Sequence, residues 1–88
     1  MYEKKAPDGS HNQCRNQIIK KRMDNGMSQR QLAVKLQCLG MNVGKNTIQR
    51  IESGERYVAD FELVYIAQAL GVEISELLMP IEEITTIL

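Results

Sequence analysis

Apolar residues recur every three or four positions over most of this chain, the spacing that places them on one face of a helix. The clearest stripe consists of Leu32, Ala33, Leu36 and Leu39. Ser28 and Gln31 make an S-x-x-Q capping box ahead of that stripe, and Gly40 follows it. A helix is therefore predicted between Ser28 and Gly40. A similar stripe consists of Leu63, Ile66, Ala67 and Leu70.

Four further helices are predicted from the same kinds of signal. The first begins at Asn12, a good N-cap residue, and ends at Gly26, which tolerates the left-handed conformation. The others run from near Gly44 to Gly54, from Asp60 to Gly71 and from about Ile74 to Leu78. No segment is predicted to form a sheet, although the terminal IEEITTIL suits either a short strand or a helical turn. The expected fold class is all-α.

The chain is expected to form one domain with two short extensions. Its 88 residues are too few for two hydrophobic cores. Residues 1–11 contain Pro7, Gly9 and few apolar residues, which predicts a flexible N-terminal arm. Residues 12–79 carry the helical pattern and form the domain, and residues 80–88 are expected to be a C-terminal tail and a candidate dimerisation segment.

The net charge of zero hides a strong asymmetry along the chain. Residues 1–50 carry ten basic and three acidic residues, a net charge of +7, whereas residues 51–88 carry one basic and eight acidic residues, a net charge of −7. A basic half of this kind favours a polyanionic partner. The alternative is a chance segregation of charges on a solvated surface.

Residues suited to catalysis or metal binding are scarce. His11 is the one histidine, and Cys14 and Cys38 are the two cysteines, so neither a catalytic triad nor a four-ligand zinc site can be assembled. No stretch approaches 18 uninterrupted apolar residues, and the N-terminus lacks a signal-peptide pattern. We expect a cytoplasmic protein that is no enzyme, holds no metal or cofactor and does not enter the membrane.

The predicted helix that begins near Gly44 has one strongly polar face. Lys45, Asn46, Gln49 and Arg50 lie opposite Ile48 and Ile51. Arg and Lys can donate to guanine O6 and N7, and Asn can pair with adenine N6 and N7. This face therefore suits base recognition in a helix-turn-helix module. From this pattern alone, an ordinary solvated helix face is the favoured interpretation, because surface helices are normally polar on one side.

Three segments together resemble the phage repressor and Cro-type helix-turn-helix family: MSQRQLAVKL, VGKNTIQRIESGERYV and DFELVYIAQALGVEISELL. The resemblance extends from about Asn12 to Leu78, roughly three quarters of the chain. It implies a compact, lambda-repressor-like domain of five helices whose second and third helices form the DNA-binding unit. It also implies a sequence-specific transcriptional regulator, with repression as the expected mode, that binds double-stranded DNA.

The resemblance also assigns roles to individual residues. Base contacts are implied for Lys45, Asn46 and Arg50, and Gln49 joins them because it lies on the same face. Contacts that grip or position the sugar-phosphate backbone are expected for Gln29, Thr47, Arg56 and Tyr57. Arg22 of the first helix and Glu52 at the end of the third match positions that form a structural ion pair in many family members.

One segment departs from the family pattern. The family usually joins its second and third helices by a turn of the type L-G-V-S, whereas this chain reads LQCLGMNVG and is about five residues longer. The apolar Leu39 predicts one extra turn on the second helix rather than a loose loop. Gly44 stands where the family usually has Ser or Thr, and glycine is an adequate N-cap.

Two other functional classes stay open. One is the antitoxin of a toxin–antitoxin pair, in which a repressor domain also binds a protein partner, and the other is a protein-interaction module of the same fold. A homodimer is expected in the regulator, because one recognition helix touches few base pairs. The apolar residues of the tail that would form its interface are Ile81, Ile84, Ile87 and Leu88. The alternative for these residues is packing onto their own domain.

Overall fold

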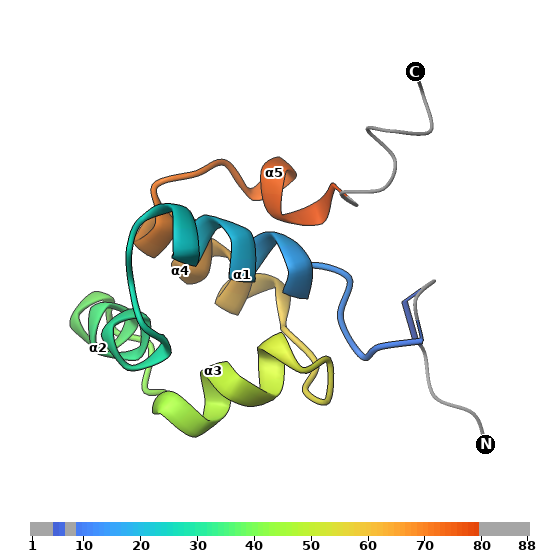
Figure 1. The fold of residues 1–88 in the computed structure, drawn as a ribbon, viewed down its shortest axis with the longest axis horizontal. Helices are drawn as coiled ribbons and strands as arrows, with labels where there is room; N and C mark the ends of the chain where they lie inside the picture. The colour runs from blue at the N-terminus through green and yellow to red at the C-terminus, as the bar shows by residue number, and fades with distance from the viewer. Residues whose placement is uncertain (1–4, 7–8, 80–88) are drawn as a thin grey trace.

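A computed structural model describes residues 5–6 and 9–79 of the chain. This part contains five helices and no strand: α1 (Arg15–Asp24), α2 (Gln29–Leu39), α3 (Lys45–Glu52), α4 (Asp60–Leu70) and α5 (Ile74–Leu78). In Figure 1, α1 and α4 lie in the middle, with α5 on one side and the α2–α3 pair on the other. The predicted all-α, five-helix fold is confirmed.

Local sequence signals predicted the ends of α2 correctly but not the start of α1. Ser28 and Gln31 form the predicted capping box, with the Gln31 N–H donating to Ser28 Oγ at 3.0 Å. Gly40, at φ +107°, ends α2 in the left-handed conformation. The first helix differs from the prediction, because it begins at Arg15 with Cys14 in the N-cap position. Asn12 is not the cap, and its side-chain amide makes long-range contacts instead.

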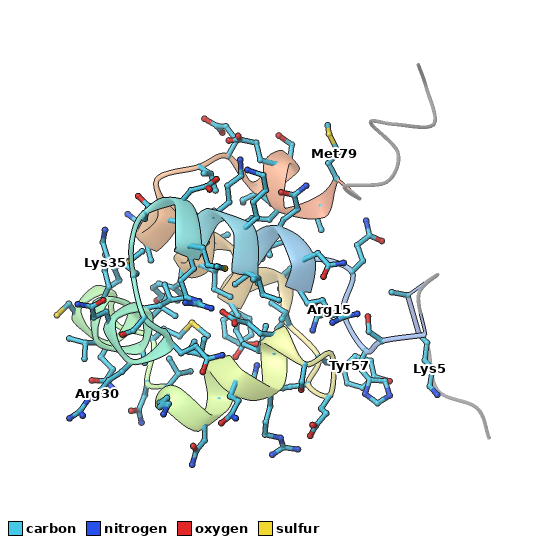
Figure 2. The ribbon with its side chains drawn as sticks, viewed as in Figure 1. Lys5, Arg15, Arg30, Lys35, Tyr57 and Met79 are labelled. Carbon is cyan, nitrogen blue, oxygen red and sulfur yellow. The ribbon has the colours of Figure 1, made fainter. Side chains whose placement is uncertain are left out.

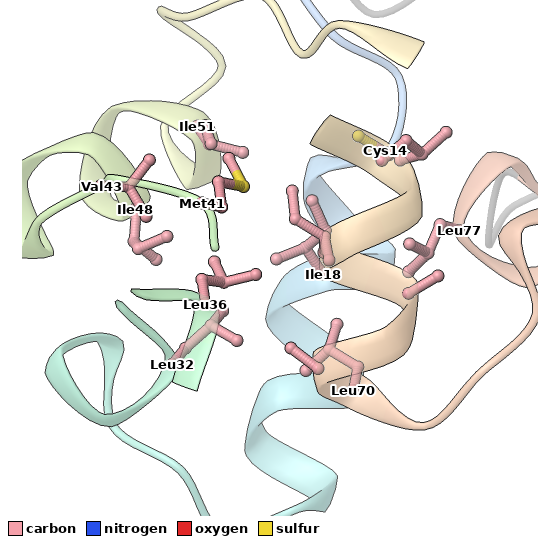
Figure 3. Packing of buried hydrophobic residues seen from close by; sticks show 14 of the residues in the cluster. Cys14, Ile18, Leu32, Leu36, Met41, Val43, Ile48, Ile51, Leu70 and Leu77 are labelled. Atoms are coloured by element: carbon pink, nitrogen blue, oxygen red, sulfur yellow. The ribbon is translucent and has the colours of Figure 1, made fainter. Parts of the chain in front are cut away.

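The core is assembled from all five helices. The seven largest fully buried side chains are those of Ile18, Leu32, Leu36, Ile48, Ile51, Ile66 and Leu77. Figure 3 shows side chains from the two sides of the domain converging on this interior. The two predicted apolar stripes face inward as expected, with Leu39 only partly buried. Burial of Ile48 and Ile51 fixes which face of α3 points away from the domain.

The long connection between α2 and α3 is packed rather than loose. α2 continues to Leu39, which is the extra turn that the sequence predicted, and residues 40–44 then lead to α3. Met41 and Val43 from this connection are buried in the core. The Gln37 side-chain amide donates to the Val43 carbonyl, and the Met41 N–H donates to the Leu36 carbonyl. The added residues therefore hold α3 against α2.

The structure describes only part of the expected N-terminal arm. The expected arm (residues 1–11) includes His11, whose N–H donates to the Gly54 carbonyl at 2.8 Å, so contact with the domain begins before residue 12. The expected tail (residues 80–88), with Ile81, Ile84, Ile87 and Leu88, lies outside the described residues. Within the described part of the chain, no helix is long and apolar enough to cross a membrane.

Candidate nucleic-acid interface

The outer face of α3 consists of polar side chains that end in hydrogen-bond donors. The four residues expected to contact bases, Lys45, Asn46, Gln49 and Arg50, are all exposed. Figure 2 shows side chains of α3 projecting away from the other helices. Thr47 is half-buried at the edge of this face. We call the four exposed residues the α3 outer face; together they offer the donor pattern that base edges in the major groove accept.

The α3 outer face carries no acidic side chain of its own, because the one carboxylate of α3 belongs to the buried Glu52. Glu55, in the loop after the helix, places its Oε2 3.8 Å from Arg50 Nε. Both side chains are about two-thirds exposed, at 65% and 64%. Exposed pairs of this kind contribute little free energy, so Arg50 can exchange Glu55 for another anionic or hydrogen-bonding partner at little cost.

Glu52 connects α3 to the two preceding helices. Its Oε2 accepts from Arg22 Nε at 2.7 Å, and its Oε1 accepts from Arg22 Nη2 at 3.0 Å and from Gln29 Nε2 at 2.9 Å. Arg22 also donates to the Met27 carbonyl, at the turn before α2. The structure thus brings together the two residues of the expected ion pair and adds Gln29. The amide of Gln29 positions the end of α3 through Glu52.

The loop between α3 and α4 holds Arg56 and Tyr57, both expected at the DNA backbone. The Arg56 guanidinium forms a bidentate ion pair with Glu62 of α4, with Nη1 3.0 Å from Oε1 and Nη2 2.9 Å from Oε2. Hydrogen bonding from Arg56 holds the pKa of the Glu62 carboxyl below its usual value, and the same pair raises the pKa of Arg56. Tyr57 is half exposed, and its ring stacks on His11 at a centroid distance of 4.8 Å.

Two residues of this region were not predicted from the sequence as parts of the interface. Glu62 also accepts the Ala59 N–H at the start of α4, and its position three residues after Ala59 is the spacing of a capping interaction. That spacing is a local signal that could have identified Glu62. Asn12 donates to carbonyls of α3 and of the following loop, and nothing near it in the sequence indicates those partners.

Metal binding has no geometric support in the described part of the chain. No group of three or more His, Cys, Asp or Glu side chains lies close enough there to hold an ion. Both cysteines are free thiols, with Cys14 buried and Cys38 exposed on α2.

Comparisons with known proteins agree with this geometry. A family model described as helix-turn-helix matches residues 18–77. A hypothetical transcription factor from Neisseria, NHTF, has a TM-score of 0.75 and 20% sequence identity, covering 100% of this chain and 95% of that one. The restriction-modification controller protein C.AhdI from Aeromonas hydrophila has a TM-score of 0.64 and 25% identity, covering 74% and 91%. No curated protein matches the sequence. The family match includes α2, α3 and α4 in full.

Proposed function

Because the chain belongs to the helix-turn-helix family of the Cro/C1 type, and is thereby a DNA-binding transcriptional regulator, we propose that it is a repressor that reads its operator with α3. The α3 outer face enters the major groove in this proposal. The likeness to a restriction-modification controller protein supports a role in gene control. Repression requires only that the bound domain obstruct transcription, which a DNA-binding domain of this size can do.

The observation that carries the proposal is the division of α3 into two faces. Ile48 and Ile51 are 1% exposed each and fix the helix to the core, so the opposite face is presented outward. Arg50 and Lys45 can donate to guanine, and Asn46 can pair with adenine. Gln49 lies among them and offers both an amide donor and an acceptor. These side chains read base edges in this proposal.

Residues around the α3 outer face contact the sugar-phosphate backbone in the same proposal. Gln29 lies at the first position of α2, and Thr47 lies at the edge of α3. Tyr57 presents an exposed hydroxyl-bearing ring on the following loop. Arg56 is held by Glu62, but its side chain is still 32% exposed, and its guanidinium has five N–H groups. Contacts of this kind set the register of the domain on the duplex without specifying sequence.

The working form in this proposal is a two-fold homodimer. A single recognition helix reads too few base pairs to distinguish an operator from the many competing sites of a genome. Two recognition helices on one face of the DNA read twice as many. The described part of the chain ends with α5 and the following residue, Met79, and apolar side chains are exposed there: Ile74, Leu78 and Met79 are 37%, 43% and 48% exposed. An isologous interface that includes α5 and the expected tail would bury them.

Selection of bound sequences from a random duplex library tests the proposal. We expect a two-fold symmetric consensus and an affinity that falls with salt, with log K decreasing by about 0.9 per phosphate neutralised for each tenfold rise in salt. Non-specific duplex of the same length serves as the control. Failure to enrich any sequence, or an affinity that does not respond to salt, would contradict sequence-specific binding.

A further inference from the structure

The residues just before α1 lie across the end of α3. We call residues 10–13 the N-terminal segment; it passes beside the loop that follows α3 (Figure 1). The His11 N–H donates to the Gly54 carbonyl at 2.8 Å, and His11 Nδ1 lies 2.9 Å from the Glu55 carbonyl oxygen. The ring of His11 stacks on Tyr57. The segment therefore contacts the loop through both backbone and side chains.

Asn12 makes the central contact of this segment. Its side chain is almost fully enclosed, and its Nδ2 donates to the Ile51 carbonyl at 3.0 Å and to the Arg56 carbonyl at 2.9 Å. One amide thus joins the last turn of α3 to the loop that follows it. Both N–H groups of this amide are used, and its Oδ1 lies 3.5 Å from the Cys14 thiol. Buried amides are costly without partners, so this arrangement strongly favours one geometry of the loop.

Gly54 shows independently how closely the segment approaches the loop. Its φ of +86° is in the left-handed region, which residues other than glycine rarely adopt. A Cβ at this position would lie 2.7 Å from Ser10 Cβ and 3.1 Å from Arg15 Cδ. The backbone at residue 54 is therefore in direct contact with the N-terminal segment, and the turn that ends α3 has no room for another side chain.

We infer that Asn12 is a positioning residue of the DNA-contacting surface: it fixes the α3–α4 loop relative to α3, so that base and phosphate contacts are made together. The inference rests on the proposed function. Ile51 directly follows Arg50, a proposed base contact, and Arg56 directly precedes Tyr57, a proposed phosphate contact. The two carbonyls bound by Asn12 therefore lie next to one residue of each kind. Loss of the Asn12 amide frees the loop to move relative to α3.

The test compares Asn12→Ala with Asn25→Ala. Asn25 is a matched control, because its Nδ2 also donates to two carbonyls, those of Lys21 and Leu70, but at the other end of α1. Both variants are measured on the selected duplex, at a temperature where circular dichroism shows each to be folded. We expect Asn12→Ala to weaken binding about tenfold and Asn25→Ala to change it less than twofold.

The salt dependence separates positioning from simple destabilisation. A partly unfolded population lowers the apparent affinity by a constant factor and leaves the slope of log K against log salt unchanged. Loss of a phosphate contact from the loop reduces that slope by about 0.9. We expect the reduced slope only in Asn12→Ala, together with faster amide hydrogen exchange at residues 54–56, where the N–H groups are hydrogen-bonded in the folded domain.

The outcomes are distinguishable. If the wild-type chain binds no duplex specifically, the proposed function fails. If the wild type binds and Asn12→Ala retains its affinity and slope, the inference is wrong. Should Asn12→Ala not fold, Asn12→Ser decides the matter, because a serine hydroxyl has one O–H and can donate to at most one of the two carbonyls. A smaller loss of affinity with a reduced slope supports the inference, and an unchanged affinity and slope overturn it.

Discussion

The guanidinium of Arg22 forms a bidentate ion pair with the carboxylate of Glu52, with Nε 2.7 Å from Oε2 and Nη2 3.0 Å from Oε1. Both side chains are largely enclosed, at 14% and 7% exposure. The pair joins α1 to the last residue of α3, and Gln29 adds a third hydrogen bond from α2. Three helices therefore meet at one carboxylate, and this carboxylate orients the helix proposed to read DNA.

Replacement of Glu52 by Gln should destabilise the fold strongly. The change leaves the Arg22 guanidinium enclosed without its counter-charge, which can cost about 3 kcal/mol or more. Thermal and urea unfolding measure the loss. Glu55→Gln is the control, because the Glu55 side chain is 65% exposed and 3.8 Å from Arg50. Equal, small effects of the two changes would show that the enclosed pair does not stabilise the domain.

Arg50 and Gln29 should differ in what they contribute to DNA binding. Arg50→Ala removes a proposed base contact, so it should cost about 1–3 kcal/mol and relax the preference at one position of the selected consensus. Gln29→Ala removes a proposed phosphate contact and a hydrogen bond to Glu52, so it should weaken all sites more evenly. Repeating the library selection with each variant measures both effects. An unchanged consensus with Arg50→Ala would refute its role as a base reader.

The sequence predicted most of the helices because their signals are local. The capping box of Ser28 and Gln31 and the left-handed Gly40 depend on neighbours within a few residues, and both were located correctly. Heptad-like apolar spacing likewise located α4. The polar pattern of α3 predicted which of its faces points outward, and burial of Ile48 and Ile51 agrees with that orientation.

The errors and omissions have a common physical cause. Asn12 has the side chain of an N-cap, but its hydrogen-bond partners are 39 and 44 residues away in the sequence. A propensity describes what a residue does locally, and tertiary contacts took precedence at this position. The same reason explains why the ion pair between Arg56 and Glu62 was not predicted. Such pairings depend on how the helices pack, which periodicity alone does not specify.

The ion pair of Arg56 and Glu62 should make stability depend on pH in the acidic range. Hydrogen bonding from Arg56 lowers the pKa of Glu62 below its usual 4.5 in the folded state. The stabilisation is therefore fully present above the pKa of the unfolded chain and is lost as the pH falls through the lowered folded pKa. Urea unfolding of the wild type and of Glu62→Gln should differ by about 1–3 kcal/mol at neutral pH and converge in acid. A difference that is the same at both pH values would contradict this linkage.

The two thiols should differ sharply in reactivity. Burial raises the pKa of Cys14 to about 11, and its side chain is 3% exposed, whereas Cys38 is exposed on α2. Because the thiolate is the reacting species, an aromatic disulfide reagent at neutral pH should modify Cys38 quickly and Cys14 only when the domain opens. Absorbance of the released thiolate measures both rates, and Cys38→Ser should remove the fast phase. A fast phase that survives in this variant would show that Cys14 is accessible.

The intact chain should sediment as a dimer whose interface includes the C-terminal tail. Two recognition helices related by a two-fold axis can occupy successive major grooves roughly 34 Å apart, which gives the specificity that one helix lacks. Apolar side chains are exposed at Ile74, Leu78 and Met79. The tail, residues 80–88, follows Met79 in the sequence and contains four large apolar residues. If the tail instead packs onto its own domain, its removal destabilises a monomer but changes no oligomeric state. Sedimentation at tens of micromolar of the intact chain and of a chain that ends at Met79 distinguishes the two arrangements. A monomeric intact chain, or a shortened one that dimerises equally well, would exclude the tail from the interface.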